Sequence, residues 1–120
     1  MNAKKKILVV DDDKHFTKIL KDWFTAKGMD VHVAHSGKDA LDTFKKNSFD
    51  IVLLDALIPK MDGFKTCQEI RKLPTGKNVP VIMMSAIYKG AREADRAKAQ
   101  CGATDYEVKP VNLMKLHEVR

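Results

Sequence analysis

Residues that could carry chemistry recur along the chain, each directly after a run of apolar residues. They are Asp11, Asp12 and Asp13, then Asp55, then Ser85, then Lys109. Carboxylates held close together repel one another, and an all-oxygen site of this kind suits Mg²⁺. A carboxylate can also act as a nucleophile and form an aspartyl phosphate, while a hydroxyl and an ammonium group can hold phosphoryl oxygens. The residue types therefore indicate metal-assisted phosphoryl transfer, if the fold brings these residues together.

Each of these residues also has an ordinary structural explanation. An aspartate after a strand is often the N-cap of the next helix, and we interpret Asp13 in this way. Ser85 could equally cap a helix, and Lys109 could be a surface lysine. The argument for chemistry rests on the combination, because each residue type occurs after the appropriate run and in the appropriate order.

Five short apolar runs predict the strands that would position these residues. They are Ile7–Val10, Val31–Ala34, Ile51–Leu54, Val81–Met84 and Tyr106–Val108. The stretches between them have helical periodicity, clearest in the stripe Phe16, Ile19, Leu20, Trp23 and Phe24. Shorter patterns predict helices around residues 40–44, 64–73, 91–101 and 111–120, and Ser36 is the expected N-cap of the second helix. Alternation of strand and helix predicts an α/β domain with a five-stranded parallel sheet.

The strand order follows from how each run is patterned. The first, third and fourth runs are apolar throughout, as in strands covered on both faces. In the second, Val31 and Val33 flank His32, and in the fifth Tyr106 and Val108 flank Glu107, which indicates edge strands. The doubly wound, flavodoxin-like order 2-1-3-4-5 satisfies this pattern. Ligands of such sheets lie at the carboxyl ends of the strands, where the strand order reverses, so the candidate residues are expected around one crevice.

Length and composition limit the class of protein. The chain of 120 residues predicts one domain spanning residues 1–120, without a transmembrane run or a signal peptide, and a cytoplasmic location is expected. Cys67 and Cys101 lack metal-site spacing and are expected to be free thiols. The net charge is +6, but the lysines are scattered over several expected helices. Direct nucleic-acid binding by this domain is therefore not expected.

The combined motifs resemble those of bacterial two-component response regulators, in their receiver domain. The matching segments are Val9-Val10-Asp11-Asp12-Asp13, Leu53-Leu54-Asp55 with Pro59 and Met61-Asp62-Gly63, Met84-Ser85-Ala86, and Gly102-Ala103-Thr104-Asp105-Tyr106 with Lys109-Pro110. The resemblance covers essentially the whole chain. It implies a phosphoacceptor domain and not an enzyme, although such domains support their own phosphorylation and dephosphorylation.

The resemblance also implies a role for each matching residue. Asp55 would accept the phosphoryl group and bind Mg²⁺, for which Mn²⁺ can substitute. Asp12 would be a direct metal ligand, Asp11 would act largely through water, and the backbone carbonyl of Leu57 would be the third protein ligand. The remaining roles fall to Lys109 and Ser85, which would contact the phosphoryl oxygens, and to Ser85 and Tyr106, which would form the switch. It further implies a cis bond between Lys109 and Pro110.

The partners implied are a sensor histidine kinase or phosphotransfer protein and a downstream output domain or protein. The chain ends about ten residues into its last expected helix, so both a stand-alone receiver and one followed by an output domain are consistent with it. Membrane association is not expected.

Three other classes of protein are alternatives. A haloacid-dehalogenase-type phosphatase would use Asp11 and Asp13, but this chain has His15 where that family has Thr or Val, and it is short for that family. A nucleotide switch would need a phosphate loop, and Pro74-Thr-Gly-Lys77 lacks the full motif and a preceding strand. An interaction module with an inactive site differs only in whether Asp55 can be phosphorylated.

Overall fold

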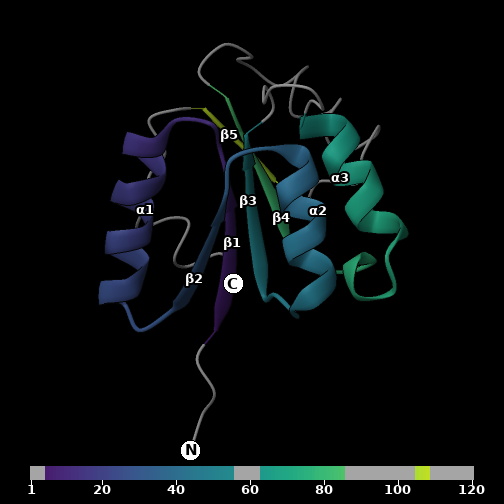
Figure 1. Cartoon of the computed structure of the whole chain (residues 1–120), viewed down its shortest axis with the longest axis horizontal. Coiled ribbons are helices and arrows are strands. Elements are labelled where there is room, and N and C mark those ends of the chain that lie inside the picture. Colours follow the sequence, from purple (N-terminus) through teal and green to yellow (C-terminus); the bar gives the residue numbers. More distant parts are fainter. Residues whose placement is uncertain (1–4, 56–62, 86–104, 109–120) are drawn as a thin grey trace, which may run out of the picture.

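Strands and helices alternate along the chain (Figure 1). The computed structural model describes residues 5–55, 63–85 and 105–108. The strands are β1 (Lys6–Val10), β2 (Asp30–Ala34), β3 (Ile51–Asp55), β4 (Val81–Ser85) and β5 (Asp105–Val108). The helices are α1 (Lys14–Ala26), α2 (Gly37–Lys46), α3 (Gly63–Lys72) and the short 3-10 helix η1 (Pro74–Gly76). The helices expected around residues 91–101 and 111–120 lie outside the described residues.

The sheet is parallel and has the order β2-β1-β3-β4-β5, which confirms the prediction. Val10 at the end of β1 pairs with Ala34 of β2 on one side and with Leu54 of β3 on the other. Asp55 pairs with Met84 of β4. The carboxyl ends of the strands therefore lie along one edge of the sheet, the upper edge in Figure 1.

Two apolar layers hold the central strands, one on each face of the sheet. Alternate residues of a strand point to opposite faces, so Ile7 and Val9 pack with α1 while Leu8 and Val10 pack with α2 and α3. Figure 1 shows α1 on one side of the sheet and α2 with α3 on the other. Each fully buried side chain of this size contributes about 1.5–3 kcal/mol relative to an exposed one. Strands β1 and β3 are therefore fixed from both faces, and so are the residues at their ends.

Helix α1 buries a narrower stripe than its sequence pattern predicts. Thr17, Leu20 and Phe24 are buried, whereas Phe16 and Trp23 are only partly covered. Ile19, expected in the core, is 58% exposed. Successive residues of an α-helix are about 100° apart, and Ile19 lies one step back from Leu20 on the side away from Thr17 and Phe24. The prediction that Ile19 faces the core was therefore wrong. The buried side of α1 extends from Leu20 toward Thr17 and Phe24, and Ile19 lies in the opposite direction around the helix.

Both ends of α1 have specific caps. The Asp13 carboxylate accepts hydrogen bonds from the backbone N–H groups of His15 (3.0 Å) and Phe16 (3.1 Å), which confirms the expected N-cap. At the other end Gly28 adopts φ 85°. The Gly28 N–H donates to the carbonyl of Thr25 (2.9 Å), and the Met29 N–H donates to the carbonyl of Phe24 (3.1 Å). This is the hydrogen-bond pattern of a Schellman motif. This turn leads directly into β2.

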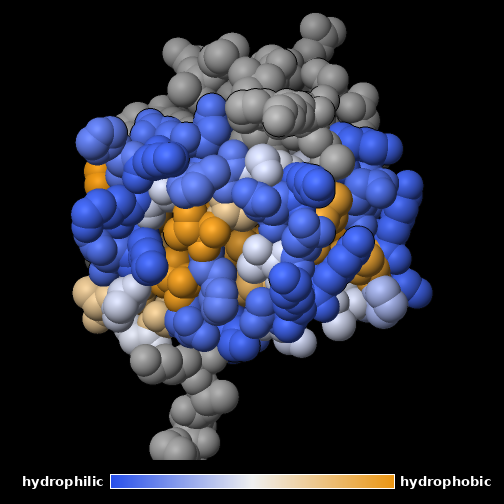
Figure 2. Space-filling model, in the orientation of Figure 1, coloured by the Kyte–Doolittle hydropathy of each residue, from blue (hydrophilic) through white to orange (hydrophobic). Residues whose placement is uncertain are grey.

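The surface of the described residues is mainly hydrophilic. Figure 2 shows apolar surface on this face between α1 and α2, near the edge strand β2, and a second apolar area toward α3. None of the described helices is long and apolar enough to cross a lipid bilayer.

Candidate functional site

Asp11 is the first residue after β1 and is completely buried. Its backbone N–H donates to the carbonyl of Ala34 (3.1 Å), which extends the pairing of β1 with β2 by one step. Its carboxylate Oδ1 accepts the backbone N–H of Asp13 (3.0 Å). The peptide and the side chain are therefore both held in place where the chain turns from β1 into α1.

Asp55 is the last residue of β3 and is only 6% exposed. The four residues before it, Ile51–Leu54, are buried on both faces of the sheet. A carboxylate so close to an apolar core costs free energy unless another group compensates its charge or donates hydrogen bonds to it. The fold thus fixes the backbone of Asp55 at the carboxyl end of a buried strand, where the ligands of doubly wound sheets lie.

The carboxylates of Asp11, Asp12 and Asp55 form one group, which we call the acidic cluster. One oxygen from each lies within 4.8 Å of one from each of the others. Asp11 and Asp55 are buried and Asp12 is exposed, so the cluster has a protein side and a solvent side. The prediction that residues after the first and third strands would meet is confirmed.

The acidic cluster fits a divalent cation on the chemistry of its donors. Two like charges about 4 Å apart repel by about 4 kcal/mol at an effective dielectric near 20, and a cation between them replaces this repulsion with attraction. All the side-chain donors are carboxylate oxygens, the ligands that suit Mg²⁺. Mg²⁺ usually keeps several waters in its octahedral shell, and the exposed Asp12 leaves the solvent side accessible to them.

The other predicted site residues are described only in part. Ser85 is the last residue of β4, at the same edge of the sheet as Asp55, and pairs with Val108. Tyr106 lies within β5 and pairs with Met83. Leu57 and Lys109, together with the Lys109-Pro110 bond, lie outside the described residues. The roles assigned to all these residues stay predictions.

One feature of the site was not anticipated from the sequence. The imidazole Nδ1 of His35, the residue after β2, lies 2.9 Å from the backbone carbonyl of Asp11. The signal was available, because the carboxyl ends of adjacent parallel strands meet at one edge, and so the residue after β2 must lie beside the residue after β1. The alternating pattern of β2 marks it only as an edge strand, and His35 was not among the predicted site residues.

The segment Pro74-Thr-Gly-Lys77 is a structural turn, as expected. It forms η1, which follows helix α3 and not a strand. A Cβ atom on Gly76 would collide with the backbone carbonyl of Ile70, so packing requires the glycine there. Arg71 then fixes the turn by donating to the carbonyls of Gly76 (2.9 Å) and Val79 (2.6 Å).

Known proteins with similar sequences place this chain among signalling domains. The sequence model of the response regulator receiver domain matches residues 7–119. The "probable transcriptional regulator ycf27" of Porphyra purpurea is 40% identical over 116 residues, which cover 96% of this chain and 45% of that protein. The regulatory protein AtoC of Escherichia coli K12 is 38% identical over 117 residues, or 98% of this chain and 24% of that protein. The chain thus spans less than half the length of these curated relatives.

Solved structures agree with this placement. The chemotaxis response regulator CheY4 of Vibrio cholerae has a TM-score of 0.87 at 28% identity, with 97% of this chain and 95% of that chain covered. The receiver domain of a sensor histidine kinase from Pseudomonas aeruginosa has a TM-score of 0.85 at 28% identity, with 98% and 94% covered. That structure holds a magnesium ion in its active-site cleft. With its family match, its doubly wound sheet and its acidic cluster, this chain belongs to the response regulator receiver domain family.

Proposed function

We propose that this domain accepts a phosphoryl group on Asp55 in a Mg²⁺-dependent reaction and signals through the resulting change of state. The observation that carries the proposal is the acidic cluster, in which the buried Asp55 lies beside Asp11 and Asp12 at the carboxyl edge of the sheet. Membership of the receiver family supports the same conclusion.

The chemical step is a displacement at phosphorus. A carboxylate oxygen of Asp55 forms a bond to phosphorus, while the bond from phosphorus to the donor, a histidine nitrogen of a kinase or phosphotransfer protein, breaks. Asp12, Asp55 and the Leu57 carbonyl would hold Mg²⁺ directly, and Asp11 would hold it through water. The bound metal would neutralise the charge that develops on the phosphoryl oxygens. Lys109 and the Ser85 hydroxyl would contact those oxygens from the opposite side.

The domain would act as a phosphoacceptor and not as an enzyme with a turnover substrate of its own. Its proposed partners are a sensor histidine kinase or phosphotransfer protein upstream and an output domain or protein downstream. The relatives that are more than twice as long as this chain, and are named as regulators, support an output function elsewhere in a longer protein.

Intact mass measurement after incubation with acetyl phosphate and Mg²⁺ tests this proposal. We expect the wild type to gain one phosphoryl group, with acetate as the leaving group, and we expect Asp55→Asn to gain none because an amide cannot form the acyl phosphate. Asp50→Asn is the matched control, since Asp50 directly precedes β3 at the opposite edge of the sheet and binds the Lys6 N–H (2.7 Å). A wild type that gains no mass would refute the function, and an Asp55→Asn variant that gains mass at the wild-type rate would refute the site.

The second part of the proposal is the switch. Phosphorylation would draw the Ser85 hydroxyl toward the phosphoryl oxygens, and Tyr106 would turn inward behind β4. The surface formed by β5 and the two helices expected beside it, around residues 91–101 and 111–120, would then change for a partner. A shift of this kind requires the phosphoryl group to favour one of the two conformations. Titration with beryllofluoride, followed by NMR, should move the resonances of Ser85 and Tyr106 together with those around Asp55; movement confined to Asp55 would contradict the coupling.

A further inference from the structure

The end of β2 holds the backbone of Asp11 from two sides. Val10 and Ala34 are the last paired residues of β1 and β2. One step further, the Asp11 N–H donates to the Ala34 carbonyl (3.1 Å), and the Asp11 carbonyl lies 2.9 Å from Nδ1 of His35. Ala34 and His35, which are consecutive at the end of β2, thus contact the N–H and the carbonyl of Asp11. The side chain of Asp11 is part of the acidic cluster.

The contact fixes the place of one hydrogen on the imidazole. A backbone carbonyl can only accept a hydrogen bond, so Nδ1 of His35 must carry the hydrogen. The bond therefore requires either the neutral Nδ1–H tautomer or the protonated ring. A histidine without such a partner is free to carry its hydrogen on Nε2, so the tautomer itself reports whether the bond exists.

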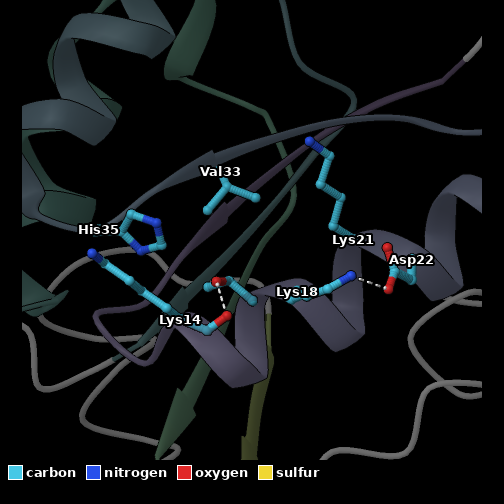
Figure 3. A pocket seen from close by; sticks show the side chains of 7 residues that line it. Lys14, Lys18, Lys21, Asp22, Val33 and His35 are labelled. Atoms are coloured by element: carbon cyan, nitrogen blue, oxygen red, sulfur yellow. Dashed lines mark hydrogen bonds and ion pairs between the residues drawn. The ribbon is translucent and has the colours of Figure 1, made fainter.

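His35 also lines a surface pocket of about 390 Å³ between α1 and β2. Figure 3 shows His35 on the wall of this pocket, with Lys14 extending toward it from the start of α1. His35 is only half-buried, so its position does not demand an aromatic ring for packing. What the imidazole adds at this place is a hydrogen-bond donor directed at the backbone of Asp11.

We propose that His35 is a positioning residue for metal binding at the acidic cluster. Its Nδ1–H bond, together with the Ala34 carbonyl, fixes the Asp11 peptide, and the Asp13 N–H fixes the Asp11 carboxylate through its bond to Oδ1 (3.0 Å). His35 itself does not touch the metal. Groups that orient metal-binding residues in this way typically change metal affinity by 10- to 100-fold when they are lost.

Two amide substitutions separate this role from simple packing. The side-chain nitrogen of asparagine can occupy nearly the position of Nδ1, so His35→Asn retains a donor to the Asp11 carbonyl. The longer glutamine places its nitrogen near the position of Nε2, so His35→Gln has the same functional group but loses this bond. His35→Leu removes every donor and serves as a second loss variant.

The experiment is a Mg²⁺ titration of the whole chain, followed by NMR, with urea unfolding of each variant in EDTA as a separate measurement. We expect the dissociation constant for Mg²⁺ to rise about tenfold in His35→Gln and His35→Leu and to stay near the wild-type value in His35→Asn. Long-range ¹⁵N–¹H spectra of the wild type should show hydrogen on Nδ1 of His35. A residue that only supports the fold would lower the urea midpoint and leave the dissociation constant unchanged.

The inference rests on the proposed function, and its failure can be told apart from a failure of that function. If the wild type binds Mg²⁺ and the Gln and Leu variants bind it equally well, the role of His35 is refuted and the metal site stands. An Nε2–H tautomer with no hydrogen on Nδ1 would refute it as well. If the wild type binds no Mg²⁺, the proposed function fails and the role of His35 fails with it.

Discussion

At the scale of single residues, position and not residue type decides what each aspartate does. Asp11 is completely buried and accepts the Asp13 N–H, Asp12 is exposed beside it, and Asp13 caps α1. The carboxylate of Asp50, directly before β3, accepts a hydrogen bond from the backbone N–H of Lys6 at the opposite edge of the sheet. Residue type alone does not separate a helix cap from a member of the acidic cluster, and the structure separates them by the atoms that each carboxylate contacts.

The separation of cap from ligand can be tested at Asp13. We expect Asp13→Ala to lower the free energy of unfolding by about 1 kcal/mol, because the N–H groups of His15 and Phe16 lose their acceptor. The dissociation constant for Mg²⁺ should not change, since the Asp13 N–H that binds Asp11 belongs to the backbone. Urea unfolding followed by Trp23 fluorescence measures the first quantity, and a Mg²⁺ titration measures the second.

Asp13→Ser is the matched control, because serine is also a good N-cap and should recover most of the lost stability. A large loss of Mg²⁺ affinity in Asp13→Ala would contradict the assignment and make Asp13 part of the metal site.

At the scale of elements, the strands and their order could be predicted because burial leaves a direct pattern in the sequence. Strands β1, β3 and β4 each contain four consecutive apolar residues and lie in the centre of the sheet, while the alternating β2 and β5 lie at its edges. Membership in the acidic cluster followed from this order, since Asp11 and Asp55 must come together if β1 and β3 are neighbours.

Two features of the structure could not be predicted from the sequence: the exposure of Ile19 on α1 and the hydrogen bond of His35. A stripe of apolar residues predicts which face of a helix turns toward the core. How many residues of that face are buried depends on how closely the helix lies on the sheet. Ile19 was therefore expected in the core but is exposed. The bond from His35 to Asp11 joins two loops that are 24 residues apart. The strand order places the two loops side by side, but no local pattern predicts the hydrogen bond itself, because it depends on the register of β1 with β2.

At the scale of the whole molecule, the fold holds like charges together that would otherwise separate. Two apolar layers bury β1 and β3, and these strands bring the carboxylates of the acidic cluster within 4.8 Å of one another. Like charges held this close repel one another, and burial of the apolar layers offsets that repulsion. Functional sites commonly reduce stability in this way.

Removing one of these charges should stabilise the domain without Mg²⁺ and make it less stable than the wild type when Mg²⁺ is present. In EDTA we expect Asp12→Ala to raise the free energy of unfolding by about 1 kcal/mol, the size of a like-charge interaction at about 4 Å in a water-like dielectric, because Asp12 is exposed. At a Mg²⁺ concentration of about 100 times the dissociation constant, the wild type should gain about 2.7 kcal/mol. The variant lacks a ligand and should gain far less, so the wild type becomes the more stable protein.

Urea unfolding of both proteins, with and without Mg²⁺, measures this reversal. Asp42→Ala, at an exposed position of α2, is the control and should alter neither comparison. High salt in EDTA should reduce the advantage of Asp12→Ala, because ions screen the repulsion between exposed charges. If the wild type is already the more stable protein in EDTA, the carboxylates of the acidic cluster do not oppose folding, and the proposed reason for metal binding would have to be sought in the phosphoryl step alone.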